Sequence, residues 1–203
     1  MSGYDECGAK GPKAGVAVPT GGYTGGTTPL QGVPLIDEMG TQAEMAAGVD
    51  IDWEGFINED VMDFDLHIGG DSDDVWPTDE EFAARPDWWP VIYIDNPGET
   101  WDPTMMNGRG ILIVRGDLEL DGGDQWDGIV MVGGKITDNG TGALSGAVIS
   151  GLNVKLGETV EESSRANGTK TYKYNSCQVE NALTQAANLS VMPNTWLDNW
   201  AAY

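Results

Sequence analysis

Three similar stretches, Gly110-Ile-Leu-Ile-Val114, Gly128-Ile-Val-Met-Val132 and Gly146-Ala-Val-Ile-Ser150, each begin 18 residues after the one before. Each is a short, mostly apolar run that starts at a glycine, which is the pattern of a buried strand. Shorter runs follow in the same register, with the apolar residues Leu118, Ile136 and Val154 aligned in the segments 117–120, 135–137 and 153–156. The repeating unit is therefore predicted to be a strand, a glycine turn, a second strand and a Gly/Asp-rich turn.

The repeat length decides between fold classes. A period of roughly 20 residues with no helix in the unit is typical of a parallel β-solenoid, in which each coil stacks its strands on the next. We therefore predict a mainly β chain with a short parallel β-solenoid or β-helix-like body and a few short helices. The alternative is a β-meander or sandwich with regular turns, because three imperfect repeats fit that arrangement as well.

The rest of the chain divides around these repeats within a single expected domain, residues 1–203. Residues 1–35 are rich in Gly and Pro and are expected to form one strand, Ala14–Val18, followed by extended loop. Residues 36–102 are expected to be an acidic helix and loop insert, and residues 103–175 hold the β repeats. Residues 176–203 are expected to form a capping helix and an aromatic tail.

Local signals predict short elements within these parts. Thr41 with Glu44, and Thr78 with the acids after it, mark the starts of two short helices, the second of which ends before Pro86. Residues 58–74 are expected to be an acidic loop, and residues 91–94 and 170–174 to be strands. The helix at 176–189 is expected to cap the open end of the stack. Its predicted apolar face is Val179, Leu183, Ala186 and Ala187, and the tail residues Trp196, Leu197, Trp200 and Tyr203 are expected to pack back on the body.

The charge excludes some partners. The chain has 33 Asp and Glu against 10 Lys and Arg, a formal charge of −23 and a sequence pI near 4.1. Such a surface repels nucleic acid and anionic membranes, which bind through Lys and Arg. No apolar run is long enough for a membrane span, and the polar start gives no sign of a signal or transit peptide. Residues 36–102 hold 20 acids and only Arg85, hence a net −19.

Two cysteines, Cys7 and Cys177, lie 170 residues apart. This spacing does not suit a metal site or a redox motif, which need close pairs such as C-x-x-C. We expect a disulfide between them, which would indicate an oxidising compartment. The alternative is two buried free thiols.

The strand and glycine pattern resembles a known family. The stretch GRGILIVRGDLELDGGDQWDGIVMVGG at 108–134, with GAVISGLNVKLG at 146–157 and KTYKYNSCQVENAL at 170–183, resembles the C-terminal ectodomain of PilX-type type IV pilus assembly proteins. In that family a pilin-like membrane helix precedes a Gly-rich β ectodomain, and this chain would begin after such a helix. The resemblance implies a bacterial extracellular or cell-envelope location and a structural role in pilus assembly, filament formation, adhesion or self-association, with pilin-like subunits or further copies as partners. It brings no catalytic residues.

Searching the residues for chemistry gives little support for an enzyme. The only histidine, His67, is expected to be an exposed loop residue beside Asp63 and Asp65, and no G-x-S-x-G nucleophile motif is present. A polysaccharide-active β-helix enzyme is the weakest alternative, with Arg109 and Arg115 near several acids in the repeats, and those residues are equally typical of surface turns. We therefore predict no catalytic residues, no required cofactor and no enzymatic activity.

The acidic segment offers one candidate metal site. Asp71, Asp73 and Asp74 follow two glycines, and Asp63 and Asp65 lie close by in the sequence. Carboxylate oxygens from flexible loops are the ligands that Ca²⁺ prefers, although the EF-hand pattern is absent. The alternative is a solvated acidic loop without an ion.

Trp76, Trp88, Trp89 and Trp101 crowd around the same acidic segment. Exposed Trp faces stack on sugar rings, so these residues suggest a binding surface for glycans, assisted by Ca²⁺. The alternative is that they anchor the acidic segment to the β body.

Overall fold

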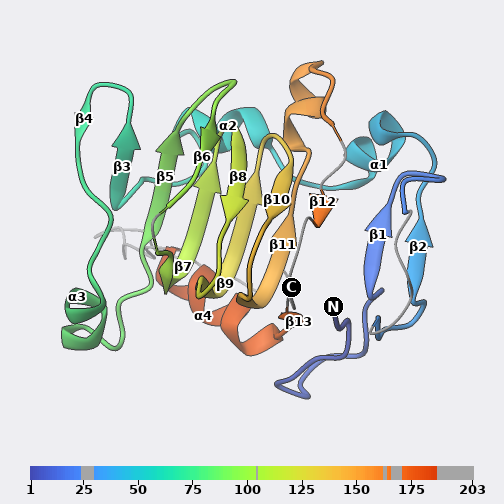
Figure 1. Ribbon diagram of the computed structural model, residues 1–203, viewed down its shortest axis with the longest axis horizontal. Helices are drawn as coiled ribbons and strands as arrows, with labels where there is room; N and C mark the ends of the chain where they lie inside the picture. The colour runs from blue at the N-terminus through green and yellow to red at the C-terminus, as the bar shows by residue number, and fades with distance from the viewer. Residues whose placement is uncertain (24–29, 104, 162–163, 166–170, 187–203) are drawn as a thin grey trace, which may run out of the picture.

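The repeats fold as neighbouring parallel strands of one large sheet. The computed structural model describes residues 1–23, 30–103, 105–161, 164–165 and 171–186 (Figure 1). The strands β7 (Asn107–Val114), β9 (Gln125–Val132) and β11 (Ala143–Ile149) lie side by side and pair in parallel. Residues 18 apart are direct partners, so the sequence repeat is the register of the sheet.

A row of glycines fixes the spacing between these strands. Gly110, Gly128 and Gly146 are aligned across the sheet, and all three have positive φ, from 124° to 142°. A β-carbon on Gly128 would lie 2.2 Å from the carbonyl oxygen of Gly110, and one on Gly146 would lie 1.8 Å from that of Gly128. Only glycine fits where the backbones approach so closely with that conformation.

The second runs of the repeats build a smaller parallel sheet. Its strands, in the order β12 (Ser164–Arg165), β10 (Ile136–Asp138), β8 (Asp117–Leu120) and β6 (Thr100–Trp101), all pair in parallel. The chain thus passes from the large sheet to the small one and back with each repeat. This parallel pairing does not fit the β-meander alternative, in which neighbouring strands are antiparallel.

The third repeat departs from the prediction in its second half. Residues 153–156 were expected to be a strand, but Leu152–Leu156 form a 3₁₀ helix, η1, between Gly151 and Gly157, both at positive φ. The side chain of Asn153 explains the change, because its Nδ2 donates to the carbonyl of Arg115 and its Oδ1 accepts from the indole of Trp53. The short strand β12 takes the next place beside β10 instead.

The acidic segment supplies strands to both sheets. The large sheet has the order β13-β11-β9-β7-β5-β3-β4, in which β5 (Val91–Asp95) and β3 (Leu66–Gly69) continue the parallel stack and β4 (Ser72–Asp73) turns back antiparallel. Residues 58–74, expected to be loop throughout, therefore contain two strands. At the other end of the sheet, β13 (Thr171–Tyr174) pairs with β11. The acidic segment is thus part of the β body.

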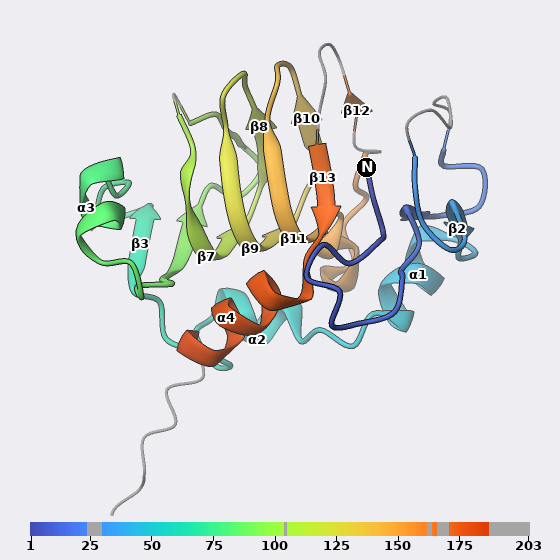
Figure 2. The same ribbon diagram turned by 90° about the horizontal axis from the view of Figure 1, so that it is seen from below.

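Two apolar clusters lie on the two faces of the large sheet. The first fills the space between the sheets and includes Leu112, Val130, Leu118 and Ile136. The second lies on the opposite face, where α2 (Trp53–Ile57) and α4 (Ser176–Ala186) cover residues such as Ile111 and Met131 (Figure 2). Sheets and helices therefore form three layers.

Helix α4 lies on a face of the large sheet, whereas we expected it to cap an end of the stack. Ala182 is fully buried there, with Val179 and Ala186 packed beside it, but Leu183, assigned to the apolar face, is 46% exposed. The expected helix residues 187–189 and the aromatic tail at 193–203 lie outside the described residues.

The other two helices begin as the sequence indicated. In α1 (Gln42–Gly48), the Thr41 hydroxyl accepts from the backbone N–H of Glu44, whose carboxylate accepts from Thr41 N–H in return. Thr78 and Glu81 form the same capping box at α3 (Asp79–Ala84). These reciprocal bonds satisfy backbone donors that the first turn leaves free.

The N-terminal segment closes the large sheet beyond β13. Ser2 N–H donates to the carbonyl of Tyr172 at 2.7 Å, and Tyr174 N–H donates to the carbonyl of Ser2 at 2.8 Å. Ser2 also forms a parallel bridge with Gln31 on its other side. Beyond this bridge, β1 (Val16–Val18) and β2 (Ile36–Glu38) form a separate two-stranded parallel sheet, and the expected strand at 14–18 is thereby shortened to three residues.

Candidate functional site

The acids predicted to bind calcium are only partly brought together. All five acids are exposed; Asp65, Asp73 and Asp74 line one hollow of about 370 Å³, and Asp63 and Asp71 lie outside its lining. One oxygen of Asp65 accepts from Val91 N–H and one of Asp74 from His67 N–H, so both carboxylates already hold the backbone. Within the described ranges, no three His, Cys, Asp or Glu side chains gather as a metal would need.

This acidic hollow combines carboxylates with one aromatic wall. Its lining is Asp65, Leu66, Asp73, Asp74, Val75, Pro77, Glu81, Arg85 and Trp88. The guanidinium of Arg85 lies 3.4 Å from the ring centre of Trp88, a cation–π contact. Of the four tryptophans predicted as a binding surface, Trp88 alone lines this hollow.

All four of these tryptophans, Trp88 included, pack against the apolar clusters. The rings of Trp76 and Trp101 lie 5.2 Å apart, and Trp76 also lies 5.6 Å from Trp126, a residue that the sequence analysis did not single out. Trp89 packs against the cluster on the other face. The rings of these tryptophans are therefore part of the apolar packing of the β body.

His67 lies in a strand and not in an acidic loop. As part of β3, its ring packs edge-on against Tyr93 at 5.0 Å, and its Nε2 lies 3.8 Å from Asp95 rather than beside Asp63 or Asp65. Asp95 also contacts the guanidinium of Arg115 and accepts from the Tyr93 hydroxyl, each at 3.3 Å. Burial, together with the negative charge of Asp95, raises the pKa of Tyr93 to about 12.

A second hollow, of about 310 Å³, lies where three repeat strands begin. We call it the strand-foot pocket, and its lining is Asp79, Phe82, Asn107, Gly108, Arg109, Gln125, Trp126, Asp127, Ala143 and Ser145. The two α3 residues face the starts of β7, β9 and β11, and the polar side chains of the strands follow the same 18-residue register. Sequence reasoning missed this pocket because polar residues before each apolar run resemble ordinary turn residues.

Arg109 is fixed at the edge of the strand-foot pocket by the end of α3. Its Nε donates to the carbonyl of Trp88 at 3.0 Å, and its Nη2 donates to those of Phe82 and Arg85 at 2.6 and 2.9 Å. These carbonyls lie at and beyond the C-terminus of α3, where a cation is favoured. Arg109 therefore holds α3 over the strands. The enzyme alternative had considered this residue only for its position near acids of the repeats.

Asp127 is the half-buried acid of the pocket. Burial raises the pKa of its carboxyl above the ordinary value, the charge of Arg109 lowers it, and the charge of Glu6 raises it further. A carboxyl with a raised pKa in a hollow is a group that keeps its proton more readily and donates a hydrogen bond when it does.

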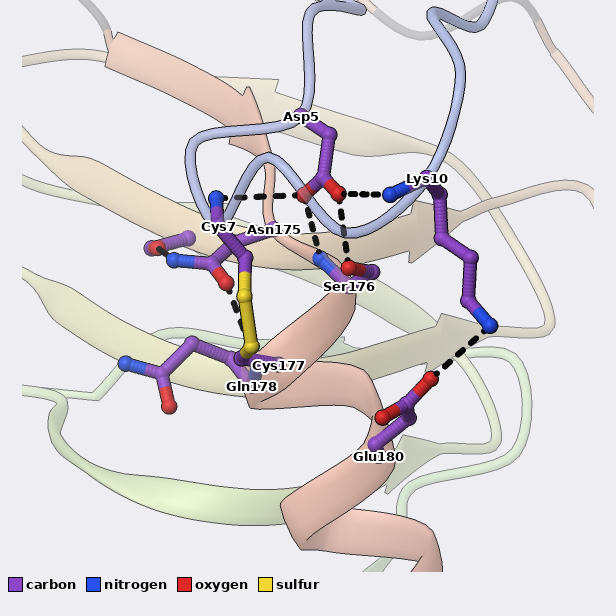
Figure 3. The surroundings of a disulfide bond; sticks show 9 residues. Asp5, Cys7, Lys10, Asn175, Ser176, Cys177, Gln178 and Glu180 are labelled. Atoms are coloured by element: carbon purple, nitrogen blue, oxygen red, sulfur yellow. Dashed lines mark hydrogen bonds and ion pairs between the residues drawn. A yellow bond between two sulfur atoms is a disulfide. The ribbon is translucent and has the colours of Figure 1, made fainter.

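Cys7 and Cys177 form a disulfide with a Cα–Cα distance of 5.7 Å, as expected (Figure 3). Beside it, the carboxylate of Asp5 accepts from the backbone N–H and the hydroxyl of Ser176, at 2.8 and 2.7 Å, and so caps the start of α4. Lys10 lies 3.1 Å from Glu180 one turn further along. Burial acts to raise the pKa of Asp5, but its hydrogen bonds outweigh that effect and lower the pKa to about 2.

The helices of the described part of the chain are all too short or too polar to span a bilayer. Comparison of the chain with protein-family models, with curated proteins and with solved structures found no match.

Proposed function

We propose that this chain is a non-enzymatic, exported structural domain of a type IV pilus-like or surface filament system, acting in the bacterial envelope or outside the cell. The observation that supports this best is the stack itself, in which the segment resembling PilX-type ectodomains supplies β7, β8 and β9, with β7 and β9 paired in an unbroken 18-residue register. We further infer that the two sheets are a short parallel β-solenoid. The disulfide supports an oxidising compartment.

The edges of the large sheet indicate how such a domain makes contacts. At one end the N-terminal segment occupies the β13 edge through Ser2. At the other end β4 pairs with Ile68 and Gly69, and Asp74 accepts the N–H of His67. Since strand addition needs free backbone groups at an edge, we infer that neighbouring subunits meet through faces and not through strand pairing.

Charge separates the two classes of partner. The acidic segment carries −19, so two copies repel one another through it, whereas a basic surface on a pilin-like subunit is attracted. Salt weakens both effects, because charges separated by more than the Debye length, about 10 Å at 0.1 M, are largely screened. Self-association is therefore expected to strengthen as salt rises, and binding to a basic subunit is expected to weaken.

Sedimentation velocity of the intact chain tests the proposal. The chain is measured alone and with any pilin-like subunits that the same genome encodes, over a range of protein and salt concentrations, and the samples are imaged for filaments. Association with either partner, in the salt direction given above, is expected. A chain that stays monomeric throughout and binds none of these subunits contradicts the proposal. A prepilin-type apolar helix encoded upstream of Met1 would support it, and an ordinary secretory signal would oppose it.

A second candidate function is calcium-assisted glycan binding, favoured by the acidic hollow. Asp65, Asp73, Asp74 and Trp88 supply carboxylates and one aromatic wall around about 370 Å³. A glycan array measured with calcium and with EDTA tests this function. Binding that requires calcium supports it, and the absence of any calcium-dependent signal rejects it.

A further inference from the structure

Three Asn-Gly dipeptides occur in the chain, at Asn107-Gly108, Asn139-Gly140 and Asn167-Gly168. In such a pair the backbone nitrogen of the glycine can attack the side-chain carbonyl carbon of the asparagine, because glycine has no β-carbon to shield that nitrogen. The reaction needs an asparagine side chain that is free to turn and a glycine N–H that no hydrogen bond holds. The structure describes the first two dipeptides, which differ in both respects, and the third lies outside the described residues.

Asn139-Gly140 lies in the turn between β10 and β11, and Asn139 is exposed there. The N–H of Gly140 makes no hydrogen bond with any residue that the structure describes. The Nδ2 of Asn139 donates to the carboxylate of Glu119 at the surface, where water competes for both groups. The attacking nitrogen and the side chain that it would attack are therefore both accessible.

Asn107-Gly108 is the same dipeptide in a protected place. It lies in β7, where Asn107 and Gly108 pair in parallel with β9, and the side-chain oxygen of Asn107 is buried. A β-carbon on Gly108 would lie 2.6 Å from the ring of Phe82 and 2.9 Å from that of Trp126. The strand pairing and these rings leave the backbone little freedom to bring the asparagine side chain over the glycine nitrogen.

We propose that Asn139 is a site of spontaneous deamidation and isomerisation, a slow one-way modification of the turn between β10 and β11. The Gly140 nitrogen forms a bond to Cγ of Asn139 and loses its proton, while Nδ2 leaves as ammonia, which gives a cyclic imide. Water then opens the ring at either carbonyl carbon, giving aspartate or isoaspartate. Water is consumed and ammonia is released, so the step needs no oxidant, reductant or cofactor. It does not depend on the structural role proposed above.

The isoaspartate product acts on the stacking of two turns. The turn that holds Asn139 lies against the turn of the previous repeat, where Gly123 N–H donates to the carbonyl of Thr141 at 2.6 Å. A β-carbon on Gly140 would lie 2.1 Å from the backbone nitrogen of Gly122, so the two turns are in close contact. Isoaspartate lengthens the main chain by a methylene at this point. The longer turn cannot keep both contacts in place.

The aspartate product acts on the charge of the same turn. In the unmodified chain the Nδ2 of Asn139 is a donor to the carboxylate of Glu119. Deamidation replaces this donor with a second carboxylate, and two carboxylates facing each other repel. Both products therefore weaken the contact between consecutive turns, and both add a negative charge to a chain that already carries −23.

Peptide mapping by mass spectrometry tests the modification. The intact folded chain and a urea-denatured sample are incubated in the same mildly alkaline buffer until the denatured chain has lost most of its amide at both sites. In the folded chain the Asn139 peptide is expected to give separate aspartate and isoaspartate products, and the Asn107 peptide to keep its amide. The proposal is overturned if folded Asn139 keeps its amide, or if Asn107 reacts as fast as Asn139 in the folded chain.

Asn139→Gln is the matched variant for the chemistry. It keeps the amide, but its longer side chain would have to close a larger and less favourable ring. No conversion is expected at this position in the folded variant. Conversion at an unchanged rate would overturn the proposed route through the Gly140 nitrogen.

Asn139→Asp gives one of the two products directly and tests the effect on the turn. Hydrogen exchange of the Gly123 amide is expected to be at least about tenfold faster than in Asn139→Gln, the effect of losing one good hydrogen bond. With Glu119→Gln in both chains, the difference is expected to shrink, because one of the two facing carboxylates is gone. Equal exchange in Asn139→Asp and Asn139→Gln would overturn the predicted loosening of the turn, whatever the mass spectra show.

Discussion

Gly128 lies in register with Gly110 of the neighbouring strand, so close that a β-carbon on Gly128 would meet the Gly110 carbonyl oxygen at 2.2 Å. Gly128 has a positive φ of 124°, and the atom that its β-carbon would meet belongs to the backbone. A backbone oxygen cannot move aside as the end of a flexible side chain can. The close stacking of these strands therefore requires glycine at the aligned positions.

Gly128→Ala is expected to lower the free energy of unfolding by about 3 kcal/mol or more, because it adds both a clash and backbone strain. Gly123→Ala is the matched control, since Gly123 also has a positive φ, 106°, but nothing lies within 4 Å of an added β-carbon. Denaturant unfolding of both variants checks the prediction. Equal losses at the two sites would show that contact between the strands contributes nothing.

Replacing both cysteines, Cys7→Ser with Cys177→Ser, is expected to lower the free energy of unfolding by about 2–5 kcal/mol. The disulfide closes a loop with a sequence separation of 170, and a long loop restricts the unfolded chain strongly. Thermal unfolding of the oxidised chain and of the double variant measures the difference. Adding a reductant to the wild-type chain should reproduce the variant, and a reductant that has no effect would contradict this account.

Asp5→Asn is expected to remove the acid sensitivity that the α4 cap introduces. The pKa of Asp5 is lowered to about 2 in the folded chain, below its ordinary value of 3.8, so its stabilisation is complete above about pH 4 and is lost as pH falls through 2. The variant should be less stable than wild type at pH 7 and approach it near pH 2. Urea unfolding at several pH values measures this, and a gap that is constant with pH would contradict it.

Asp127→Asn is expected to raise the stability of the folded chain at neutral pH, whereas Asp5→Asn lowers it. Burial raises the pKa of Asp127, so its contribution is present below the ordinary value and declines as pH rises through the raised one. The neutral variant should match wild type at about pH 3 and be more stable than wild type at pH 7. The same urea series tests this, and a variant that is less stable at pH 7 would show that the ionised Asp127 is favoured by its partners.

Arg109→Met is expected to cost about 2–3 kcal/mol and to loosen α3, because three carbonyls lose a charged donor. Arg85→Met is the control, since Arg85 lies exposed over Trp88 and is expected to cost well under 1 kcal/mol. Hydrogen exchange of the α3 amides follows the local effect. Similar exchange in the two variants would reject the assigned role of Arg109.

The strand repeats and capping boxes were open to prediction because each depends on nearby residues. The glycine spacing of 18 predicted parallel register, and Thr41 and Thr78 predicted helix starts that the structure confirms. The 3₁₀ helix η1 was missed because its cause is distant: Asn153 is held by Trp53, a residue 100 positions away. A pattern of neighbouring residues cannot indicate a partner so far away in the sequence.

The candidate sites show the same division. Asp65 and Asp74 looked like free metal ligands, yet each accepts a backbone N–H that only the folded strands bring near. Conversely, the strand-foot pocket is lined by α3 and by the starts of three strands. Asn107 and Asp127 therefore come to line one hollow only when the strands pair in their observed register. The 18-residue spacing of Asn107 and Gln125 could have indicated that they lie side by side, since the apolar runs that follow them have the same spacing.

The hydrogen bonds between Ser2 and the strand β13 have a consequence for how the chain matures. They join residues about 170 positions apart, which raises the contact order, so we expect them to form late in folding. Synthesis proceeds from the N-terminus, so Ser2 cannot form these bonds until Tyr172 and Tyr174 have been made. A chain cut short before Thr171 would leave the edge of β11 open to aggregation. These hydrogen bonds therefore form only when both the segment around Ser2 and the strand β13 are present.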